Sequence, residues 1–573
     1  MALASTVHAP LSTPPYRVAL MRLATDPAML WPAFLTLLVG TPWLGGGYIF
    51  GTDWPGPRRF DFPSNLSSSA PLEAALSALS VAISAQLAAK VLIFGFLFAG
   101  SYLAYRALPV GDFIPRASAS ALFVVNPFVY SRMHYGQLYL LAGYCALPWV
   151  LIRLDHLLHR PSLLNGTLMA LSVALVGVFT PHLTLVAGIL ATVMAAFFTV
   201  AAEQRVAYLK SLAPSALAAA AVAFVLSAYW VIPLLLARGV EGSRIASFGP
   251  GDLIAFAAVP DERLGLVPNL LGLYGFWAED TARFTSLKAF VPYWPLAMAG
   301  ILVVSGVGVR WAFSRQPRRA VAPWVTGLLV AGAIALILEM GVSHPATAGI
   351  TRWLDAHFTF YRGMRDAGKW AALLALVYSQ LFGLGAAAIL ERVRNLKLKP
   401  AAIEWVGATA AGLLLALPLY YGNGLLFGFH GGIRPSQYPA GWYAADRALG
   451  EDPHPGRTLF LPWHLYLSFP FIENQNEVVA CPAPTFFSVP ILYSRDPGVF
   501  GVPPPEDRDQ EAVAVLVKAG EHGQWARTLS GLGVKYILLA KTVDWATYKF
   551  LDTQTGIARV ADYGSIVLYK DTG

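Results

Sequence analysis

The stretch MLWPAFLTLLVGTPWLGGGYIFGTDWPGPRR, residues 29–59, decides the fold class of this chain. Residues 29–48 are apolar and long enough to cross a bilayer core, which is about 30 Å thick. Asp53 follows at once, so a carboxylate stands where the chain leaves the membrane. Two prolines stiffen the next segment, which ends in Arg58 and Arg59. A carboxylate held there can serve as a base toward a substrate at the membrane surface.

The composition extends this membrane assignment to most of the chain. Of 573 residues, 56% are hydrophobic and 13% are charged, whereas soluble chains carry about 25% charged residues. Window hydropathy predicts about eleven spanning helices, so the expected fold is mostly α, a polytopic membrane helical bundle. The predicted cores are 29–48, 86–106, 115–131, 137–154, 163–180, 183–202, 212–236, 290–310, 322–341, 370–390 and 402–421.

Positive charges predict the orientation of these helices. The clusters fall at alternate junctions: Arg17 and Arg22; Arg106 and Arg116; Arg153 and Arg160; Arg205 and Lys210; Arg310, Arg315, Arg318 and Arg319; Arg392, Arg394, Lys397 and Lys399. Because short cytoplasmic loops carry the excess of Lys and Arg, we expect the N terminus inside and the C terminus outside the cell. This dispersal of the net charge of +8 does not indicate nucleic acid as a partner.

The long segments then all lie on the outer face. We expect a transmembrane domain at 1–422, with external loops at about 49–85, 237–289 and 342–369. Apolar residues at helical spacing in the first loop predict a short interfacial helix near 72–84. Residues 423–573 change in composition, and β-rich runs there predict an extracytoplasmic soluble α/β domain. The expected strands are 457–464, 476–482, 486–493, 534–541 and 565–570, with a helical stretch at about 510–532.

Asp53 is the first candidate for chemistry. It is the carboxylate immediately outside the first helix, and Asp61 in the same loop is a second candidate. The plain alternative is a solvated carboxylate without a role, because charges at a bilayer interface are common and cost little.

A cluster of cations stands at the outer entrance of the tenth predicted helix. Arg362, Arg365 and Lys369 recur at spacings of three and four, which would place them on one helical face. Positive charge is disfavoured on the outer side, and phosphate is its natural partner. The alternatives are headgroup contacts and pairing with Asp355 and Asp366.

Other polar groups are candidates for holding the acceptor or the sugar: Arg132 and His134 between the third and fourth helices, His182 in a short turn, and Trp277, Glu279 and Asp280, with Arg283, in the large loop. The alternative for Arg132 and His134 is an ordinary capped turn, and for His182 it is a structural hydrogen-bond donor. For the residues of the large loop the alternative is a packing surface. The sequence has neither a Walker phosphate loop nor a dinucleotide-binding glycine motif, so any donor must arrive already activated.

Four stretches together resemble the GT-C superfamily of membrane glycosyltransferases, in particular the membrane core of actinobacterial-type arabinofuranosyltransferases. They are GYIFGTDW at 47–54, VNPFVY at 125–130, YRGMRDAGK at 361–369 and LGVKYILLA at 532–540. The resemblance implies an inverting enzyme that takes a sugar from a polyprenyl phosphate in the outer leaflet. The sugar goes to an extracytoplasmic glycan, lipid or protein acceptor.

The resemblance also implies roles for particular residues. Asp53 matches the acidic base of the first external loop, and the cations of 362–369 together with Arg58 and Arg59 are the expected ligands of the donor phosphate. Many relatives carry paired acids in that loop, but Asp53 has no acidic neighbour, which leaves a divalent cation such as Mg²⁺ or Mn²⁺, and its ligands, open.

A second class of function stays open at this point. A non-catalytic or transport protein of cell-envelope polysaccharide or lipid assembly would share the fold. A transporter should show polar side chains at mid-depth in its helices, and few are present. A non-catalytic relative would have lost the base, and Asp53 is retained.

Overall fold

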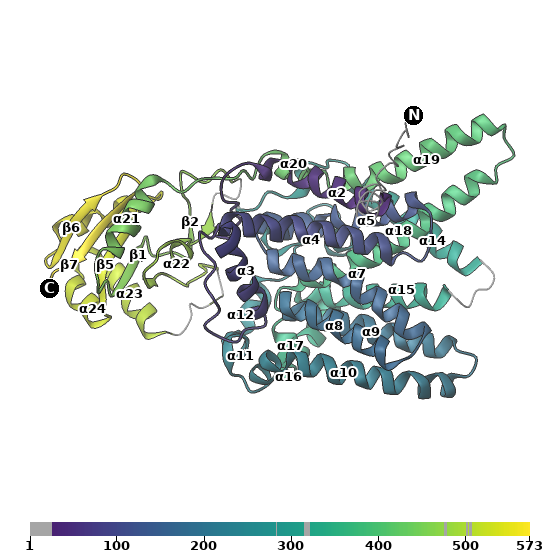
Figure 1. Cartoon of the computed structure of the whole chain (residues 1–573), viewed down its shortest axis with the longest axis horizontal. Coiled ribbons are helices and arrows are strands. Elements are labelled where there is room, and N and C mark those ends of the chain that lie inside the picture. Colours follow the sequence, from purple (N-terminus) through teal and green to yellow (C-terminus); the bar gives the residue numbers. More distant parts are fainter. Residues whose placement is uncertain (1–25, 282, 315–320, 475–477, 500–501, 503–506) are drawn as a thin grey trace, which may run out of the picture.

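The computed structural model describes residues 26–573 except 282, 315–320, 475–477, 500, 501 and 503–506. Figure 1 shows a bundle of long helices with a small sheet domain at one end. Five cations of the predicted cytoplasmic face lie outside the described residues: Arg17, Arg22, Arg315, Arg318 and Arg319.

Nine segments of the described residues are long and apolar enough to cross a membrane, and the chain is a multi-pass membrane protein. They are α2 with η1 (Pro27–Gly40, Thr41–Leu44), α4 (Ala85–Ala107), α7 (Leu138–His159), α9 (Pro181–Ala201), α10 with α11 (Arg205–Leu235, Gly239–Ala246), α14 (Trp294–Ser314), α15 with η4 (Ala322–Met340, Gly341–Ser343), η5 with α18 (Ala367–Trp370, Ala371–Arg394) and α19 (Pro400–Tyr421). Helix α18 is buried along most of its length and packs against α14 and α15, which makes it the central element of the bundle.

Two of the eleven predicted segments differ from this set. Helix α8 (Leu163–Phe179) is apolar but has 17 residues, and it packs against α7 and α10. The prediction of a single helix at 115–131 is wrong, because the chain forms two helices there, α5 (Phe113–Val124) and α6 (Pro127–Tyr135).

Asn126 is the physical reason for this break. Its side-chain Nδ2 donates to the carbonyls of Leu122 and Phe123 at the end of α5, at 2.9 and 2.7 Å. Its Oδ1 accepts from the N–H of Val129 at 3.0 Å, which caps the start of α6. Pro127, which lacks an N–H, follows as the first residue of the new helix.

The segments predicted to be external form short helices around one end of the bundle. These are α3 (Ala70–Ile83), α12 (Pro250–Ala255), α13 (Leu266–Leu271), η2 (Trp277–Asp280), η3 (Leu287–Ala289), α16 (Pro345–His357) and α17 (Thr359–Arg362). Helix α3 confirms the short helix predicted near 72–84. Figure 1 shows α3, α11 and α12 at the same end of the bundle as the sheet domain.

The C-terminal region forms the predicted small α/β domain. Its strands are β1 (Arg457–Leu461), β2 (Tyr466–Leu467), β3 (Val479–Ala480), β4 (Ile491–Leu492), β5 (Val534–Ala540), β6 (Ile557–Asp562) and β7 (Ile566–Asp571). The main sheet has the order β4-β1-β5-β7-β6, and β1 runs parallel to β4 and β5. Strands β2 and β3 form a separate antiparallel pair.

After the last spanning helix, η6 (Asn423–Leu425) and α20 (Leu426–His430) pack against the bundle. The helices of the sheet domain are α21 (Ala440–Gly450), α22 (Ala483–Phe486), α23 (Arg508–Ala519), η7 (Gly520–His522), α24 (Trp525–Gly531) and η8 (Trp545–Thr553). The helical stretch predicted at 510–532 is divided at Gly520, whose φ of +57° ends α23. The strand predicted at 486–493 is shortened to β4, because α22 ends at Phe486 and residues 487–490 form neither helix nor strand.

At the junction of the bundle and the sheet domain, each of the two regions packs residues into the core of the other. Leu425, Phe429 and Ile433, all beyond the last spanning helix, pack into the core of the bundle. In return Phe50, from the first external loop, packs into the core of the sheet domain with Tyr438. The loop that carries Asp53 therefore lies between the two regions.

Candidate functional site

Two glycines bring the Asp53 loop against the end of α6. Gly136 ends α6 in the left-handed conformation, with a φ of +83°, as helix C-termini commonly do. A Cβ placed on Gly51 would come within 2.7 Å of the Cα of Gly136, so no larger residue fits at this crossing. The backbone N–H of Asp53 donates to the carbonyl of Tyr135 at 2.7 Å. The loop is thus anchored at the catalytic candidate itself.

Two side chains hold the carboxylate of Asp53. The hydroxyl of Tyr466 donates to Oδ1 at 2.7 Å, and Nε2 of Gln137 donates to Oδ2 at 3.2 Å. Asp53 is half-buried. Burial raises the pKa of this carboxyl above its usual value, and the two hydrogen bonds, with the charges of Arg244 and Arg132, offset only part of the rise. A raised pKa is what a base near neutral pH requires.

Gln137 links Asp53 to a buried ion pair. Its Oε1 accepts from the Arg132 guanidinium at 2.8 Å, and that guanidinium forms two hydrogen bonds to the carboxylate of Asp366. Arg132 is 1% exposed and also stacks on the ring of Phe276 at 4.5 Å. Burial alone would raise the pKa of Asp366, but the Arg132 charge and hydrogen bonds bring it below its usual value. This network fixes Gln137, and through it the orientation of Asp53.

Positive charge gathers beside this network. The charges of Lys369, Arg244, Arg365 and Arg132 all interact with the ring of His182. Neither Arg244 nor Lys369 forms an ion pair within the part of the chain that the structure describes, and Lys369 makes one long hydrogen bond, 3.4 Å, to the carbonyl of Gly363. These two cations are therefore available to an anionic group near Asp53.

The three cations predicted to share one helical face do not share one. Helix α17 ends at Arg362, and a turn separates it from η5, which contains Lys369. Arg362 donates to the backbone carbonyl of Asp355 at 3.3 Å. Arg365 lies in the turn, bonded to the buried carboxylate of Asp252. The spacing argument failed because it assumed a continuous helix.

Arg365 is also stacked between two aromatic rings. Its guanidinium lies 3.9 Å from the ring centre of Phe248 and 4.4 Å from that of Phe256. With Asp252 and both rings already in contact, Arg365 has less capacity for a further anion than Lys369.

Arg58 and Arg59, predicted beside the donor phosphate, instead hold the sheet domain. Arg58 donates to Asp446 at 2.6 Å and to the carbonyl of Phe486 at 3.2 Å. Arg59 donates to the carbonyl of Pro484 at 3.2 Å and pairs with Asp61. The chain leaves Asp53 toward the C-terminal region, so sequence neighbours of Asp53 become contacts between domains.

The large loop predicted at 237–289 contributes aromatic side chains beside Tyr135, and its described acids do not hydrogen-bond Asp53. The ring of Trp277 lies 5.2 Å from that of Tyr135 and 4.8 Å from that of Phe256. Glu279 faces Lys288 at 3.6 Å, and burial raises the pKa of Glu279. Asp280 is exposed, and in the described part of the chain neither acid hydrogen-bonds Asp53.

His134 is packed in an aromatic environment. Its ring lies 4.8 Å from that of Phe284 and 5.5 Å from that of Phe429, and it is fully buried. Burial lowers the pKa of His134 to about 3, so the side chain is neutral at physiological pH. The position fits a packing role better than contact with the acceptor.

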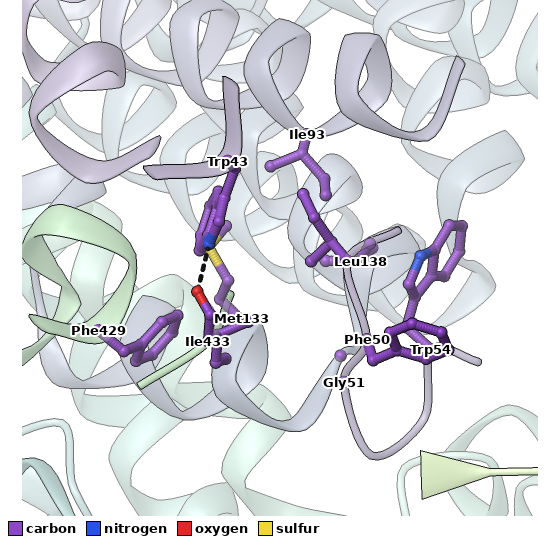
Figure 2. Close-up of a pocket in the computed structure, with 11 residues that line it drawn as sticks. Trp43, Phe50, Gly51, Trp54, Ile93, Met133, Leu138, Phe429 and Ile433 are labelled. Carbon is purple, nitrogen blue, oxygen red and sulfur yellow. Dashed lines mark hydrogen bonds between the residues drawn. The ribbon is translucent and has the colours of Figure 1, made fainter. Parts of the chain in front are cut away.

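An apolar pocket adjoins the Asp53 loop (Figure 2). Phe50, Gly51 and Trp54 of the loop form one part of its lining, and Trp43 forms another. The indole of Trp43 donates to the carbonyl of Ile433 at 3.0 Å, the dashed line in Figure 2. The loop is therefore held by apolar packing as well as by hydrogen bonds.

Two members of this site were not singled out from the sequence. Arg244 lies in α11, where a basic residue in a long loop carries no distinguishing signal. Tyr466 lies in β2, more than four hundred residues from Asp53, in a stretch between the predicted strands 457–464 and 476–482. No pattern along the chain relates either residue to Asp53.

The groups around Asp53 are not suitable ligands for a divalent cation. Asp53 faces a hydroxyl, an amide and positive charge, and the carboxylate of Asp366 is already bonded to Arg132. Among the described residues there is no group of three or more His, Cys, Asp or Glu that could hold a metal ion. Asp53 is a single carboxylate under positive charge from Arg244 and Arg132, and one carboxylate in such surroundings binds Mg²⁺ weakly.

No protein-family model and no curated protein matches the chain. Solved structures do. Arabinofuranosyltransferase AftD from Mycobacteria matches with a TM-score of 0.59 and 14% identity, over 96% of this chain and 40% of that one. A mutant of AftD matches with a TM-score of 0.59 and 17% identity, over 95% and 41%. ArnT from Cupriavidus metallidurans bound to undecaprenyl phosphate gives 0.41 and 13%, over 97% and 98%, a score too low to support an argument.

The likeness to AftD establishes the fold. The helical bundle with its C-terminal sheet domain has the same fold as the aligned part of AftD, and it is the mostly α architecture with a small α/β domain that the sequence predicted. This chain spans about two fifths of the AftD chain, so the activity of that enzyme is not transferred by the match.

Proposed function

We propose that this protein is an inverting glycosyltransferase that moves a sugar from a polyprenyl-phosphate donor to an extracytoplasmic glycan, lipid or protein acceptor. One observation carries the proposal. A half-buried carboxylate, Asp53, lies beside a group of cations, two of which, Arg244 and Lys369, have no ion-pair partner among the described residues. A base and an anion-binding group at one place are what transfer from a sugar phosphate requires.

Asp53 acts as the general base in this scheme. It takes the proton of the acceptor hydroxyl while that oxygen attacks the anomeric carbon of the sugar. The bond between the anomeric carbon and the phosphate oxygen breaks, and the phosphate leaves with the electron pair. Attack opposite the leaving group inverts the anomeric configuration. The hydrogen bonds from Tyr466 and Gln137 keep the carboxylate oriented for the proton transfer.

The cations stabilise the departing phosphate. Lys369 and Arg244 both act electrostatically at the ring of His182, and Arg244 also acts on Lys369, so the fields of the two cations overlap in a single small region. Charge-assisted hydrogen bonds to phosphate are stronger than neutral ones. Lys369 stands at the start of the central span, where a phosphate can be bound while its prenyl tail stays in the membrane.

The similarity in fold suggests which donor to test first. AftD is an arabinofuranosyltransferase, and a polyprenyl-phosphate pentofuranose is therefore the first candidate donor for this chain. Trp277, whose ring lies beside that of Tyr135, is the candidate for packing against the sugar.

The decisive experiment replaces Asp53 with Asn, which keeps the shape and removes the proton acceptor. Transfer from a radiolabelled polyprenyl-phosphate sugar should fall by at least about 10²-fold, the usual contribution of a general base. Donor binding to the same variant should stay unchanged, because Asp53 does not contact the phosphate in this scheme. Transfer at the wild-type rate would show that Asp53 is not the base and would favour the non-catalytic alternative.

In the wild-type protein, transfer should depend on pH in the direction that a base with a raised pKa requires. Protonated Asp53 cannot accept a proton, so activity should fall as the pH drops through a value above the usual aspartate pKa. The acid limb of the profile of kcat/KM against pH measures that value.

We also propose that the sheet domain is extracytoplasmic, in keeping with the cation distribution. With Cys145 and Cys481 replaced by Ala, Thr547→Cys in the sheet domain should react with a membrane-impermeant maleimide on intact cells. Asn395→Cys, in the turn between α18 and α19, should react only after the cells are opened. The reverse pattern would place Asp53 on the cytoplasmic side and overturn the assignment of a lipid donor in the outer leaflet.

A further inference from the structure

The side chain closest to the Asp53 carboxylate does not come from the membrane region. The hydroxyl of Tyr466, in strand β2 of the sheet domain, donates to Oδ1 at 2.7 Å. This is shorter than the 3.2 Å hydrogen bond from Gln137 to the other oxygen. The sheet domain therefore supplies the stronger of the two hydrogen bonds to the proposed base.

The backbone of the same small sheet holds the residue before Asp53. The N–H of Ala480 in β3 donates to the carbonyl of Thr52 at 2.7 Å. Ala480 is the cross-strand partner of Tyr466 in the antiparallel pair of β2 and β3. One rung of this ladder thus contacts both Thr52 and Asp53, which fixes the hydroxyl of Tyr466 relative to the loop.

The rest of the loop is held by the same domain. Tyr48 and Ser436 exchange two backbone hydrogen bonds, at 2.8 and 2.9 Å. Tyr438 donates from its hydroxyl to the carbonyls of Pro55 and Gly56, at 2.9 and 2.8 Å. The loop is therefore held on both sides of Asp53 as well as at the carboxylate.

We propose that Tyr466 is a positioning residue of the site, which holds Asp53 in place and stabilises its ionised form, so that the sheet domain is an integral part of the site. The proposal rests on the function assigned above for its consequence in transfer, but its statement about Asp53 stands on the geometry alone. A hydrogen bond donated to a carboxylate favours the charged form over the protonated one.

The surroundings of Tyr466 keep its hydroxyl a donor. Burial, and then the charge of Asp53, raise the pKa of Tyr466 well above its usual value. The phenol therefore keeps its proton wherever Asp53 is ionised, and the pair has one state in which the carboxylate accepts from the hydroxyl. The remaining lone pairs of the carboxylate stay open to the hydroxyl of an acceptor.

The test compares two tyrosines of the sheet domain in the purified full-length protein. Tyr466→Phe removes the hydroxyl that contacts Asp53, and Tyr438→Phe removes one that contacts only the backbone of the same loop. Each change keeps the ring that packs in place. The titration of Asp53 is followed by infrared difference spectroscopy of the protonated carboxyl, whose band is identified by its loss in Asp53→Asn.

The midpoint of the Asp53 titration should rise by about one to two pH units in Tyr466→Phe, the value of a hydrogen bond to a charged group. It should not move in Tyr438→Phe. An unchanged midpoint in Tyr466→Phe, or an equal shift in both variants, would overturn the proposal. Incorporation of 3-fluorotyrosine at position 466 gives a stronger donor without removing any group, and should move the midpoint downward; no movement there also counts against the proposal.

Transfer provides the second measurement. In Tyr466→Phe the acid limb of the profile of kcat/KM against pH should move upward together with the infrared midpoint, while KM for the donor stays constant. An infrared shift without any transfer activity in the wild type would contradict the proposed function and leave the role of Tyr466 supported. Transfer by both proteins with the acid limb unmoved in Tyr466→Phe would support the proposed function and contradict the role of Tyr466.

Discussion

Two pairs of arginines show how differently position in the sequence and position in space relate to Asp53. Arg58 and Arg59 follow Asp53 within six residues, yet they bind Asp446 and the backbone of the sheet domain. Arg132 and Arg244 lie far along the chain, yet their charges act on the Asp53 carboxyl. Nearness along the chain therefore did not indicate which arginines act on the Asp53 carboxyl.

The difference comes from the direction in which the loop leaves the bundle. Backbone contacts from the sheet domain at Tyr48 and Thr52 turn the loop toward that domain, so residues past Trp54 face it. On the other side, the contact of Gly51 with Gly136 sets Asp53 against the end of α6. Arg58 and Arg59 therefore connect the loop to the sheet domain, whereas the charges of Arg132 and Arg244 act on the Asp53 carboxylate.

The largest effect should come from the buried arginine of the second pair. Arg132→Met leaves Asp366 buried without its partner and should lower the free energy of unfolding by about 3–5 kcal/mol. Thermal unfolding in detergent at pH 7 measures the loss. The double variant Arg132→Met/Asp366→Leu is the matched control and should recover most of it. A single variant as stable as the wild type would mean that this pair does not organise the site.

The ion pair should also respond to pH in a defined direction. Because the folded protein holds the pKa of Asp366 below its usual value, the pair contributes its full stability above the usual aspartate pKa. That contribution is lost as the pH falls through the lower pKa of the folded state.

A smaller effect is expected from Lys369, one of the two cations of the site that form no ion pair among the described residues. Lys369→Met should weaken donor binding by about 10- to 150-fold, the loss of one charge-assisted contact. Arg362→Met changes the net charge equally in the same segment, but Arg362 is not among the cations that act on His182 together with Lys369, so donor binding should stay nearly constant. Binding of a polyprenyl phosphate to both purified variants makes the comparison. Equal losses would point to the general field of the segment rather than to Lys369.

The smallest effect should come from the first pair. Arg58→Ala removes a partly exposed ion pair, 32% exposed on the Arg58 side, and should cost up to about 1 kcal/mol of stability. Donor binding should be unaffected because Arg58 faces the sheet domain. A loss of donor binding as large as that of Lys369→Met would return Arg58 to the donor site and remove the contrast between the two pairs.

The sequence by itself determined the membrane class of this protein, the place of Asp53 after the first helix, helix α3 and the strands β1, β5 and β7. These follow from hydropathy and periodicity, which act over a few neighbouring residues. Only the tertiary structure decided that α17 and η5 are separate and that Arg365 is already paired with Asp252.

The hydrogen-bond partners of Asp53 were also decided only by the tertiary structure. Tyr466 reaches it because β2 and β3 pair beside the loop, and Gln137 reaches it because α6 ends in a left-handed glycine. Such contacts join residues that are remote along the chain, and their identity depends on how helices and strands pack. Apolar patterns state which residues are buried, whereas the partner that a buried polar group finds is decided by the whole fold.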